Sequence, residues 1–307
     1  MKNCDLIFIT GSNGLLGSAI TRRLKLKGYQ NVCGITRTEC DLSDKLAGPK
    51  LRQCFEKPKY IFHAASLVGG IGKNIKYPAD FGLVNSKINN TVIEWAHTAG
   101  SKLLFIGSSC IYPRKCPQPM KEDYLMAGPC EPTNEMYALS KIYGIKLCQA
   151  FRKQYGCNFI TCQPSNIYGE GDHFDENAHV VGSLINKFHL GKTKNTPVTL
   201  WGDGTAMREL TYVDDVADAC IFLMENYNGE ELINIGTGED ITIQNLAEEI
   251  KYIIGYENVI NWDTSKPNGM PRKVLDVSKI HNLGWKHSID LNTGLEKTYN
   301  WYLENII

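Results

Sequence analysis

The 307-residue sequence lacks an excess of charge of either sign, because 33 Lys and Arg balance 33 Asp and Glu. It therefore lacks the basic excess that nucleic-acid binding and attachment to anionic membranes usually need. No apolar run approaches the ~18 residues of a membrane span. Leu6–Ile9 is too short for the hydrophobic part of a signal peptide. These absences predict a cytoplasmic protein with neither a nucleic-acid partner nor a membrane partner.

Cysteine is frequent but follows no pattern that would pair it. Eleven Cys is an odd number, and no two stand in a CxxC spacing, which excludes a fully paired disulfide framework and the usual zinc spacing. Several lie in apolar segments, where a thiol packs as a small hydrophobic group: Cys4, Cys33, Cys148, Cys162 and Cys220. We expect reduced thiols and no metal site.

The remaining composition is that of an ordinary folded protein. Hydrophobic residues make up 43% and charged residues 21% of the chain, which excludes a disordered protein. No internal repeat or low-complexity tract is present. At roughly 150 residues per domain, the length suggests about two domains.

Short apolar runs alternate with longer amphipathic segments over the first half of the chain. Strands are expected at 6–10, 32–36, 60–64, 103–108 and 159–163, with helices at 18–26, 85–99 and 135–155. This alternation predicts an α/β fold, a Rossmann-like doubly wound parallel sheet covered by helices on both faces.

The alternation changes near residue 170, where loops lengthen and Gly and Pro recur. We expect a first domain over 1–170, to which 210–236 returns. A smaller α/β C-terminal domain would comprise 171–209 and 237–307.

A glycine-rich turn joins the first expected strand to the first helix. Three glycines at GxxGxxG spacing allow a tight turn, close approach to a pyrophosphate and packing of the helix on the strand. Placed between strand and helix of a βαβ unit, the turn predicts a dinucleotide site. Its expected cofactor contacts are Gly11, Asn13, Gly14, Leu15 and Gly17.

The end of the second strand favours NADP over NAD. An acidic residue there would accept the ribose hydroxyls of NAD, but Arg37 stands in its place. Its planar fork can pair with a 2′-phosphate, although a solvated surface charge is the alternative. Asp41 and Leu42 would suit an adenine contact.

A serine at a later strand end and a Tyr–Lys pair on the next helix complete a catalytic pattern. Tyr137 and Lys141 are four residues apart and share one helical face. The ammonium is expected to lower the pKa of the phenol, and Ser108 to hydrogen-bond the carbonyl or alcohol that reacts. This ordered set resembles the extended short-chain dehydrogenase/reductase superfamily.

Longer blocks make the resemblance closer. From about residue 60 to the end, the chain is similar to the GDP-L-fucose synthase family in Val68–Ile71, Gly107–Pro113, Glu131–Glu135, Pro164–Gly169, Trp201–Gly204 and Lys266–Asp276. That family epimerises carbons 3 and 5 of a GDP-4-keto-6-deoxy-mannose and then reduces carbon 4 with NADPH. The resemblance implies an NADP-dependent oxidoreductase with a GDP-linked 4-keto sugar as substrate.

By position, the resemblance implies Ser108, Tyr137 and Lys141 as the reduction triad, with Cys110 and His179 as base and acid of the epimerisation. Carbons beside a ketone are acidified, so a thiolate and an imidazole on opposite faces could invert them. The alternative is a buried Cys beside a helix-capping His.

The resemblance also implies ligand contacts in the second half of the chain. Pro164, Asn166 and Ile167 would join the cofactor site. GDP would be held by Asn166, Val180, Lys187, Trp201, Arg208 and Lys273. The Trp could pack on the base and the cations could neutralise the diphosphate; a core Trp and surface cations are the alternative.

The sequence leaves two rival functions open. Relatives that reduce other GDP-4-keto sugars, including heptoses, without epimerising them make a reductase alone the first rival. A non-catalytic dinucleotide-sensing protein is the second, although the retained Tyr137 and Lys141 oppose it. The family also suggests a homodimer formed through the helices near 85–99 and 135–155.

Overall fold

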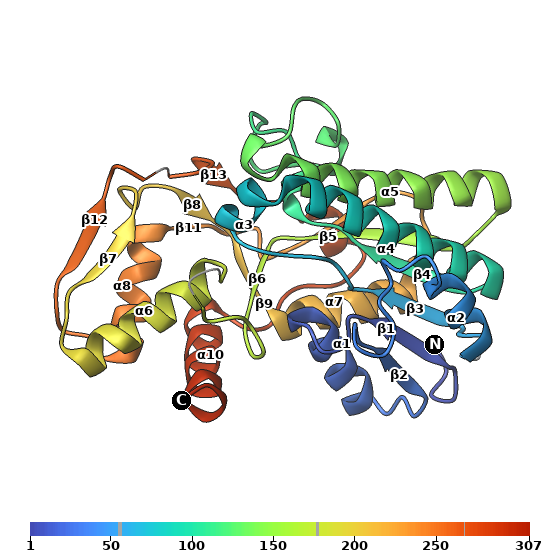
Figure 1. The fold of residues 1–307 in the computed structure, drawn as a ribbon, viewed down its shortest axis with the longest axis horizontal. Helices are drawn as coiled ribbons and strands as arrows, with labels where there is room; N and C mark the ends of the chain where they lie inside the picture. The colour runs from blue at the N-terminus through green and yellow to red at the C-terminus, as the bar shows by residue number, and fades with distance from the viewer. Residues whose placement is uncertain (55–56, 176–177, 267) are drawn as a thin grey trace.

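A six-stranded parallel sheet dominates the computed structural model, which describes residues 1–54, 57–175, 178–266 and 268–307 (Figure 1). The strand order is β10-β5-β4-β3-β1-β2. The strands are β1 (Ile7–Thr10), β2 (Val32–Ile35), β3 (Tyr60–His63), β4 (Lys102–Ile106), β5 (Phe159–Pro164) and β10 (Ile233–Ile235). β1, β4, β5 and β10 are buried along their whole length, as strands covered on both faces are. The predicted doubly wound α/β fold is confirmed.

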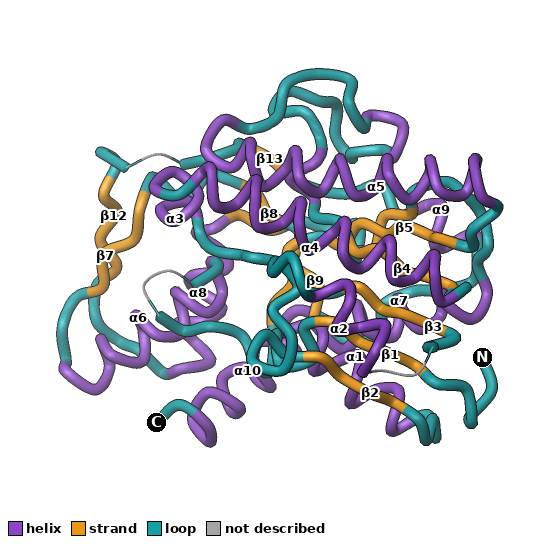
Figure 2. The backbone as a smooth tube through the Cα atoms, turned by 45° about the vertical axis from the view of Figure 1, so that its right-hand side comes forward, coloured by secondary structure: helices purple, strands orange, loops and turns teal. Residues whose placement is uncertain are grey.

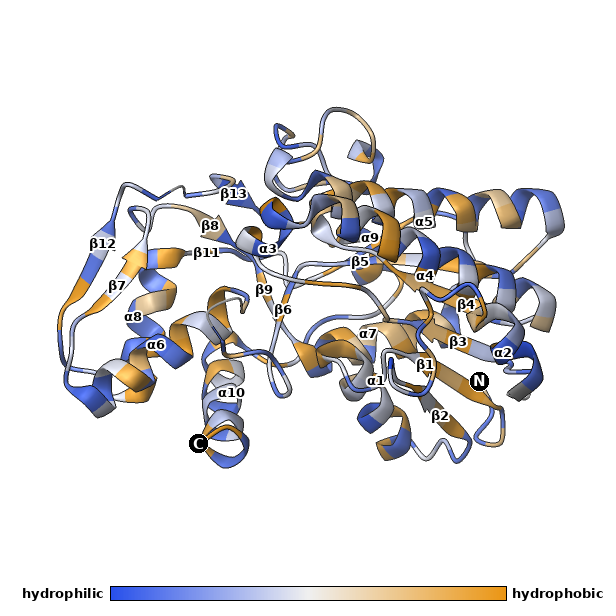
Figure 3. Cartoon of the chain, viewed as in Figure 1, coloured by the Kyte–Doolittle hydropathy of each residue, from blue (hydrophilic) through white to orange (hydrophobic). Residues whose placement is uncertain are grey.

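Helices cover both faces of the sheet (Figures 1 and 2). On one face, α4 (Pro78–Ala99) lies beside α5 (Glu135–Tyr155), with α2 (Ala47–Cys54) against α4. On the other, α1 (Leu15–Leu26) packs against α7 (Val213–Asn226). Figure 3 shows apolar residues along the strands and mixed faces along α4 and α5. We call the sheet and these helices the first region.

The predicted helix at 85–99 begins earlier than expected, at residue 78. Pro78 occupies its first turn, where the missing N–H costs nothing and the fixed φ suits a helix. The predicted helix at 135–155 has those bounds in the structure. Within the described residues, no helix is both long and apolar enough to cross a membrane.

Shorter elements build the rest of the fold. Within the part of the chain that the structure describes, small sheets with orders β11-β8-β13, β12-β7 and β6-β9 accompany five further helices and three 3-10 turns. The bounds are α3 (Ile71–Lys76), η1 (Ser109–Ile111), η2 (Glu122–Tyr124), η3 (Pro132–Asn134), β6 (Asn166–Tyr168), α6 (Val180–Lys194), β7 (Val198–Trp201), β8 (Met207–Arg208), β9 (Leu210–Tyr212), β11 (Ile241–Thr242), α8 (Ile243–Ile254), β12 (Ile260–Asp263), β13 (Arg272–Lys273), α9 (Ser278–Asn282) and α10 (Leu291–Asn305). We call α6, β7, β8, β11–β13, α8 and α10 the second region.

Each region has a hydrophobic core of its own. The second core gathers side chains of α6, β7, α8 and α10, including Phe188, Ile250 and Tyr302. Val277 and Trp285 pack in the first core instead, so part of 237–307, expected with the second domain, lies against the large sheet. The domain limits themselves stay a prediction.

The strand order places the catalytic edge of the sheet. The chain passes from β1 to β2 on one side and places β3, β4 and β5 on the other, so the order reverses beside β1. Because the strands are parallel, the loops after β1, β3, β4 and β5 emerge at one edge. In open α/β sheets, ligands bind at such a reversal.

Candidate active site

A cavity of about 490 Å³ opens at this edge. Its wall begins with the glycine turn, where Gly11 has a φ of +69°. A Cβ on Gly17 would stand 2.1 Å from the Gly11 carbonyl oxygen, so α1 could not pack there with a larger residue. No side chain caps the N-terminus of α1, and the first N–H groups of a helix have no partner within it. The turn thus fits a pyrophosphate.

All of the predicted cofactor residues line this cavity. They are Gly11, Asn13, Gly14, Leu15, Gly17, Arg37, Asp41, Leu42, Tyr137, Lys141, Pro164, Asn166 and Ile167. The Arg37 side chain is 75% exposed, and its Nε lies 3.2 Å from Asp41 Oδ2. A guanidinium this open can turn to an incoming phosphate, so the residues present fit NADP(H).

The three predicted reduction residues meet on the same wall. Ser108 follows β4, while Tyr137 and Lys141 project from α5. Lys141 is buried; its Nζ donates to the Ile106 carbonyl at 3.0 Å and lies 5.9 Å from the centre of the Tyr137 ring. Burial lowers the pKa of Lys141 to about 8. The cation is therefore held in place close to Tyr137.

The expectation of a lowered tyrosine pKa is wrong for this structure. Burial raises the pKa of Tyr137 well above its ordinary value, and the Ser108 and Ser66 hydroxyls lower it only in part. Desolvation of the anionic form, with a smaller contribution from Cys110, outweighs the two serine hydrogen bonds. Tyr137 is consequently a phenol at neutral pH, the form that can give a proton to an oxygen.

The two predicted epimerisation residues differ in access. Cys110 is 5% exposed and does not belong to the cavity wall; its thiol donates to Ser108 Oγ at 3.3 Å. Burial raises the pKa of that thiol, while Lys273, Ser108 and Lys141 lower it. The structure therefore places Cys110 directly behind Ser108.

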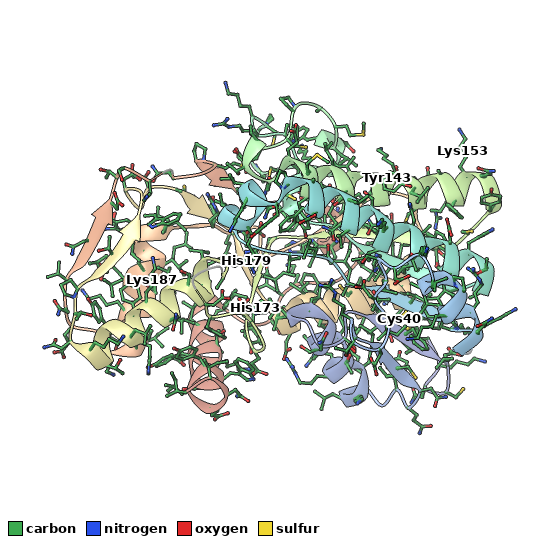
Figure 4. The ribbon with its side chains drawn as sticks, viewed as in Figure 1. Cys40, Tyr143, Lys153, His173, His179 and Lys187 are labelled. Atoms are coloured by element: carbon green, nitrogen blue, oxygen red, sulfur yellow. The ribbon has the colours of Figure 1, made fainter. Side chains whose placement is uncertain are left out.

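His179 lines the cavity at the N-cap of α6, but its side chain makes no capping hydrogen bond. The helix-capping alternative is thus not what the structure shows. Burial lowers the pKa of His179, and the nearby charges of Lys273 and His173 lower it further. The neutral imidazole is therefore favoured. Figure 4 shows His173 and His179 between the two regions.

The predicted GDP contacts lie mostly beyond this cavity. Asn166 lines it and donates to the Glu209 carbonyl at 2.9 Å, whereas Val180, Lys187, Trp201, Arg208 and Lys273 are outside its wall. Trp201 is 60% exposed, with Lys266 Nζ 5.7 Å from its ring centre. The exposed ring excludes the core-Trp alternative.

Arg208 and Lys187 are held by main-chain carbonyls. Arg208 Nη1 donates to Met207 at 2.7 Å and Met270 at 2.6 Å. Lys187 Nζ donates to Thr199 at 3.2 Å. Lys273 pairs with Arg208 in the register of β13 and β8. Arg208 and Lys273 thus lie on adjacent strands, and all three cations are outside the wall of the cofactor cavity.

Sequence reasoning missed several side chains of the cavity wall. Ser66 lies three residues after β3 and Asp172 in the loop before α6. Asp172 is 6% exposed, its Oδ2 has no hydrogen-bond partner, and burial raises its pKa to about 7. The position of Ser66 after a strand could have signalled it; no local pattern signals Asp172.

A buried polar chain behind the wall was also missed. His63 Nδ1 lies 2.8 Å from Thr10 Oγ1, and His63 Nε2 lies 3.2 Å from Asn89 Oδ1. Asn89 Nδ2 then donates to the Ser140 carbonyl at 2.9 Å, between Tyr137 and Lys141 in the chain. These hydrogen bonds connect β1, β3 and α4 to α5, the helix that carries Tyr137 and Lys141. Among the described residues, no group of three or more His, Cys, Asp or Glu could hold a metal ion.

Comparison with known proteins agrees with this geometry. A family model described as the NAD dependent epimerase/dehydratase family matches residues 7–236. GDP-L-fucose synthase 1 of Arabidopsis thaliana is 47% identical over 303 residues, covering 98% of this chain and 94% of that protein. GDP-L-fucose synthase of Escherichia coli (strain K12) is 45% identical over 313 residues, covering 97% of each.

Solved structures share the whole fold. MlghC, a GDP-mannoheptose C4 reductase from Campylobacter jejuni with NADP bound, is 36% identical. It covers 99% of each chain with a TM-score of 0.90. From the family model, the near full-length identities and the shared fold, the chain belongs to the GDP-L-fucose synthase family, within the NAD dependent epimerase/dehydratase family.

Proposed function

We propose that this protein is an NADPH-dependent enzyme that epimerises carbons 3 and 5 of a GDP-linked 4-keto sugar and reduces carbon 4. The observation that carries the proposal is the meeting of Ser108, Tyr137 and Lys141 on the wall of the cavity lined by the cofactor residues. NADPH, when bound, supplies the hydride. The relatives named GDP-L-fucose synthases support the GDP-sugar as substrate.

Tyr137 provides the proton for the reduction. Its phenol O–H bond breaks, the proton goes to the carbon 4 oxygen, and a phenolate remains on Tyr137. The Lys141 ammonium, fixed by the Ile106 carbonyl, stabilises that phenolate. The Ser108 hydroxyl hydrogen-bonds the same sugar oxygen, which aligns the ketone for the transfer.

Cys110 and His179 invert the two carbons beside the ketone. A Cys110 thiolate removes a proton from carbon, and the electrons move into an enolate whose oxygen Ser108 and Tyr137 can hydrogen-bond. The imidazolium form of His179 then gives its proton to the opposite face and becomes neutral, while Cys110 is left as a thiol. Burial raises the pKa of Cys110, and Lys273 and Lys141 offset part of that rise and so favour the thiolate.

The two regions divide the ligand between them. The first domain (1–170, with 210–236) holds the cofactor through the residues of the cavity wall. The second domain (171–209 and 237–307) holds GDP through Val180, Lys187, Trp201, Arg208 and Lys273, together with Asn166 of the first domain. The exposed Trp201 ring supports base packing, and the nearby cations support a diphosphate contact.

A reductase without epimerase activity, acting on a GDP-heptose, is the second candidate. The specific observation in its favour is the burial of Cys110 behind Ser108, outside the cavity wall. The 36% identity to a protein named as a GDP-mannoheptose C4 reductase agrees with it.

One experiment tests both candidates. The protein is given NADPH and GDP-4-keto-6-deoxy-mannose in deuterated water, and the product is examined by mass spectrometry and NMR. Deuterium at carbons 3 and 5 supports the proposal, and reduction without it supports the second candidate. Cys110→Ser is the matched control, since it should abolish deuterium uptake. Unchanged NADPH absorbance with every 4-keto hexose and heptose tested would refute both.

We further propose that the protein is a cytoplasmic homodimer. Leu83 of α4 and Met136, Leu139 and Tyr143 of α5 are exposed at 39–58%, and α4 and α5 lie side by side. Two copies would bury these side chains in a four-helix contact. Light scattering should give twice the chain mass, and Leu139→Glu should give the mass of one chain. The buried free thiols Cys110, Cys162 and Cys220 suit a reducing compartment.

A further inference from the structure

A second serine stands at the catalytic edge, beside the one that the family pattern predicts. β3 and β4 are parallel neighbours, and their register pairs His63 with Phe105. Ser66 and Ser108 each follow three residues after that pair, at equivalent places beyond adjacent strands. Both line the cavity with Tyr137, and both hydroxyls act on its phenol.

Asn85 of α4 holds Ser66 in position. Ser66 Oγ donates to Asn85 Oδ1 at 2.8 Å, and the Leu67 N–H donates to the same oxygen at 2.7 Å. Asn85 Nδ2 donates to the carbonyls of Leu67 at 3.0 Å and Phe81 at 2.9 Å. These two carbonyls fix which end of the amide is the oxygen. Ser66 is thus anchored from a helix that does not carry Tyr137.

The anchor sets what Ser66 can do for Tyr137. While Tyr137 is a phenol, the single Ser66 hydroxyl hydrogen is directed to Asn85, and Ser66 Oγ can only accept. If that hydrogen turns away, Asn85 Oδ1 keeps the Leu67 N–H and is not left unsatisfied. The hydroxyl is therefore free to donate to a phenolate.

We propose that Ser66 stabilises the phenolate that forms on Tyr137 when carbon 4 is reduced, by turning its hydroxyl hydrogen from Asn85 to the phenolate oxygen. The inference rests on the proposed function. In the step, the phenol O–H bond breaks and its proton moves to the sugar oxygen; Ser66 keeps its own proton and changes only its hydrogen-bond partner. Ser66 thereby acts on the reduction and not on the epimerisation.

Two further observations support the assignment. Ser66, like Ser108, lowers the pKa of Tyr137, which is the effect of a donor to the charged form. The Phe81 ring meets the Tyr137 ring edge-on, with centroids 6.1 Å apart. Because Asn85 also binds the Phe81 carbonyl, the same clamp places both the serine and one side of the phenol.

Ser66→Ala tests the role. A hydrogen bond to a charged group changes a rate by about 10- to 100-fold, so kcat for NADPH oxidation should fall by that factor, with the sugar KM within about 3-fold. Deuterium exchange at carbons 3 and 5, measured without NADPH, should stay within about 2-fold. Ser66→Thr, which keeps the hydroxyl, should restore kcat to within about 3-fold of the wild type.

Ser140→Ala is the matched control, since Ser140 Oγ donates to the Tyr137 carbonyl at 2.7 Å and not to the phenol; NADPH oxidation should stay within about 3-fold. The inference is overturned if Ser66→Ala keeps kcat, if it slows exchange and reduction alike, or if Thr fails to rescue. Should the Ala variant not fold, the isosteric Ser66→Cys must show the same selective loss of kcat. A wild-type protein that oxidises no NADPH would instead refute the proposed function.

Discussion

The first region and the second region bring their functional side chains together by different means. In the first, Ser66, Ser108 and the glycine turn follow neighbouring strands of one parallel sheet, so the backbone ladder aligns them. In the second, Arg208 is positioned by hydrogen bonds from its own side chain to the Met207 and Met270 carbonyls. The sheet holds reacting groups at fixed distances, whereas a side chain that is held by main-chain carbonyls can exchange them for a ligand. Substitutions in the first region should therefore change kcat, and those in the second should change KM.

The sharpest test of this contrast is Tyr137→Phe. Loss of the positioned proton donor should lower kcat by about 10²- to 10⁴-fold, with the sugar KM within about 3-fold because the ring remains. Steady-state NADPH oxidation measures both values, and deuterium uptake without NADPH should continue.

Tyr143→Phe serves as the control for Tyr137→Phe. Tyr143 lies on the outer side of the same helix, where its hydroxyl donates to Asn90 at 2.7 Å (Figure 4), and its loss should leave kcat unchanged. A near-normal kcat for Tyr137→Phe would show that the phenol is not the proton donor. It would also contradict the assignment of the reaction to the first region.

Arg208→Ala is the corresponding test of the second region. The guanidinium should neutralise the diphosphate, so the sugar KM should rise about 10- to 100-fold, with kcat within about 3-fold. Arg208→Lys should not restore the KM, because an ammonium cannot hold two carbonyls and a phosphate in a planar fork.

The neighbouring Arg272→Ala provides a matched loss of charge. Arg272 is exposed and paired with Asp240 at 2.6 Å, so its loss should leave the KM unchanged. If Arg208→Ala lowered kcat and left the KM unchanged, it would contradict the claim that the second region binds the substrate and the first region carries out the reaction.

Sequence patterns predicted the first region better than the second for a physical reason. Strand, turn and helix signals are local, and a parallel sheet converts them into positions in space, so local patterns were enough to place the glycine turn, Ser108 and Tyr137 at one edge. The pKa of Tyr137 was not predictable in this way, because burial depends on packing by distant segments. Asp172 likewise gives no local signal.

In the second region, residue types were predictable only through the family resemblance. The carbonyls that hold Arg208 include Met270, 62 residues away in the chain, and no periodicity specifies that contact. Val277 and Trp285 pack in the first core for the same reason. Their position depends on long-range contacts with the large sheet, which no local pattern specifies.

Arg37→Ala tests whether a side chain of the first region also contributes to binding, here of the 2′-phosphate of NADPH. Arg37 is 75% exposed, so solvent weakens its charge, and we expect a rise of only about 5- to 10-fold in the KM for NADPH. The KM for NADH, which has no 2′-phosphate, should not change and is the internal control. An equal rise in KM for both cofactors would show that Arg37 maintains the conformation of the loop and does not bind the 2′-phosphate.

Asp172→Asn probes the loop where the two regions meet, and its expected effect is the smallest. Burial raises the pKa of Asp172 to about 7, whereas an unfolded chain has about 3.9. The folded state therefore binds this proton more tightly, and its stability falls as pH rises from about 4 to 7. The Asn variant does not titrate, so its Tm should exceed that of the wild type at pH 8 by about 2–4 °C. The difference should shrink toward pH 5.

Asp290→Asn supplies a control of opposite sign for Asp172→Asn. Asp290 caps α10 by accepting the Thr293 N–H at 2.9 Å, which lowers its pKa. Its charge stabilises the folded state above the unfolded pKa, so the Asn variant should melt slightly below the wild type at pH 8. Thermal melts at pH 5 and pH 8 separate the two cases. If Asp172→Asn also melted lower at pH 8, a contact to the carboxylate would stabilise the folded state by more than burial of the charge destabilises it. The ionised Asp172 would then stabilise the loop between the two regions.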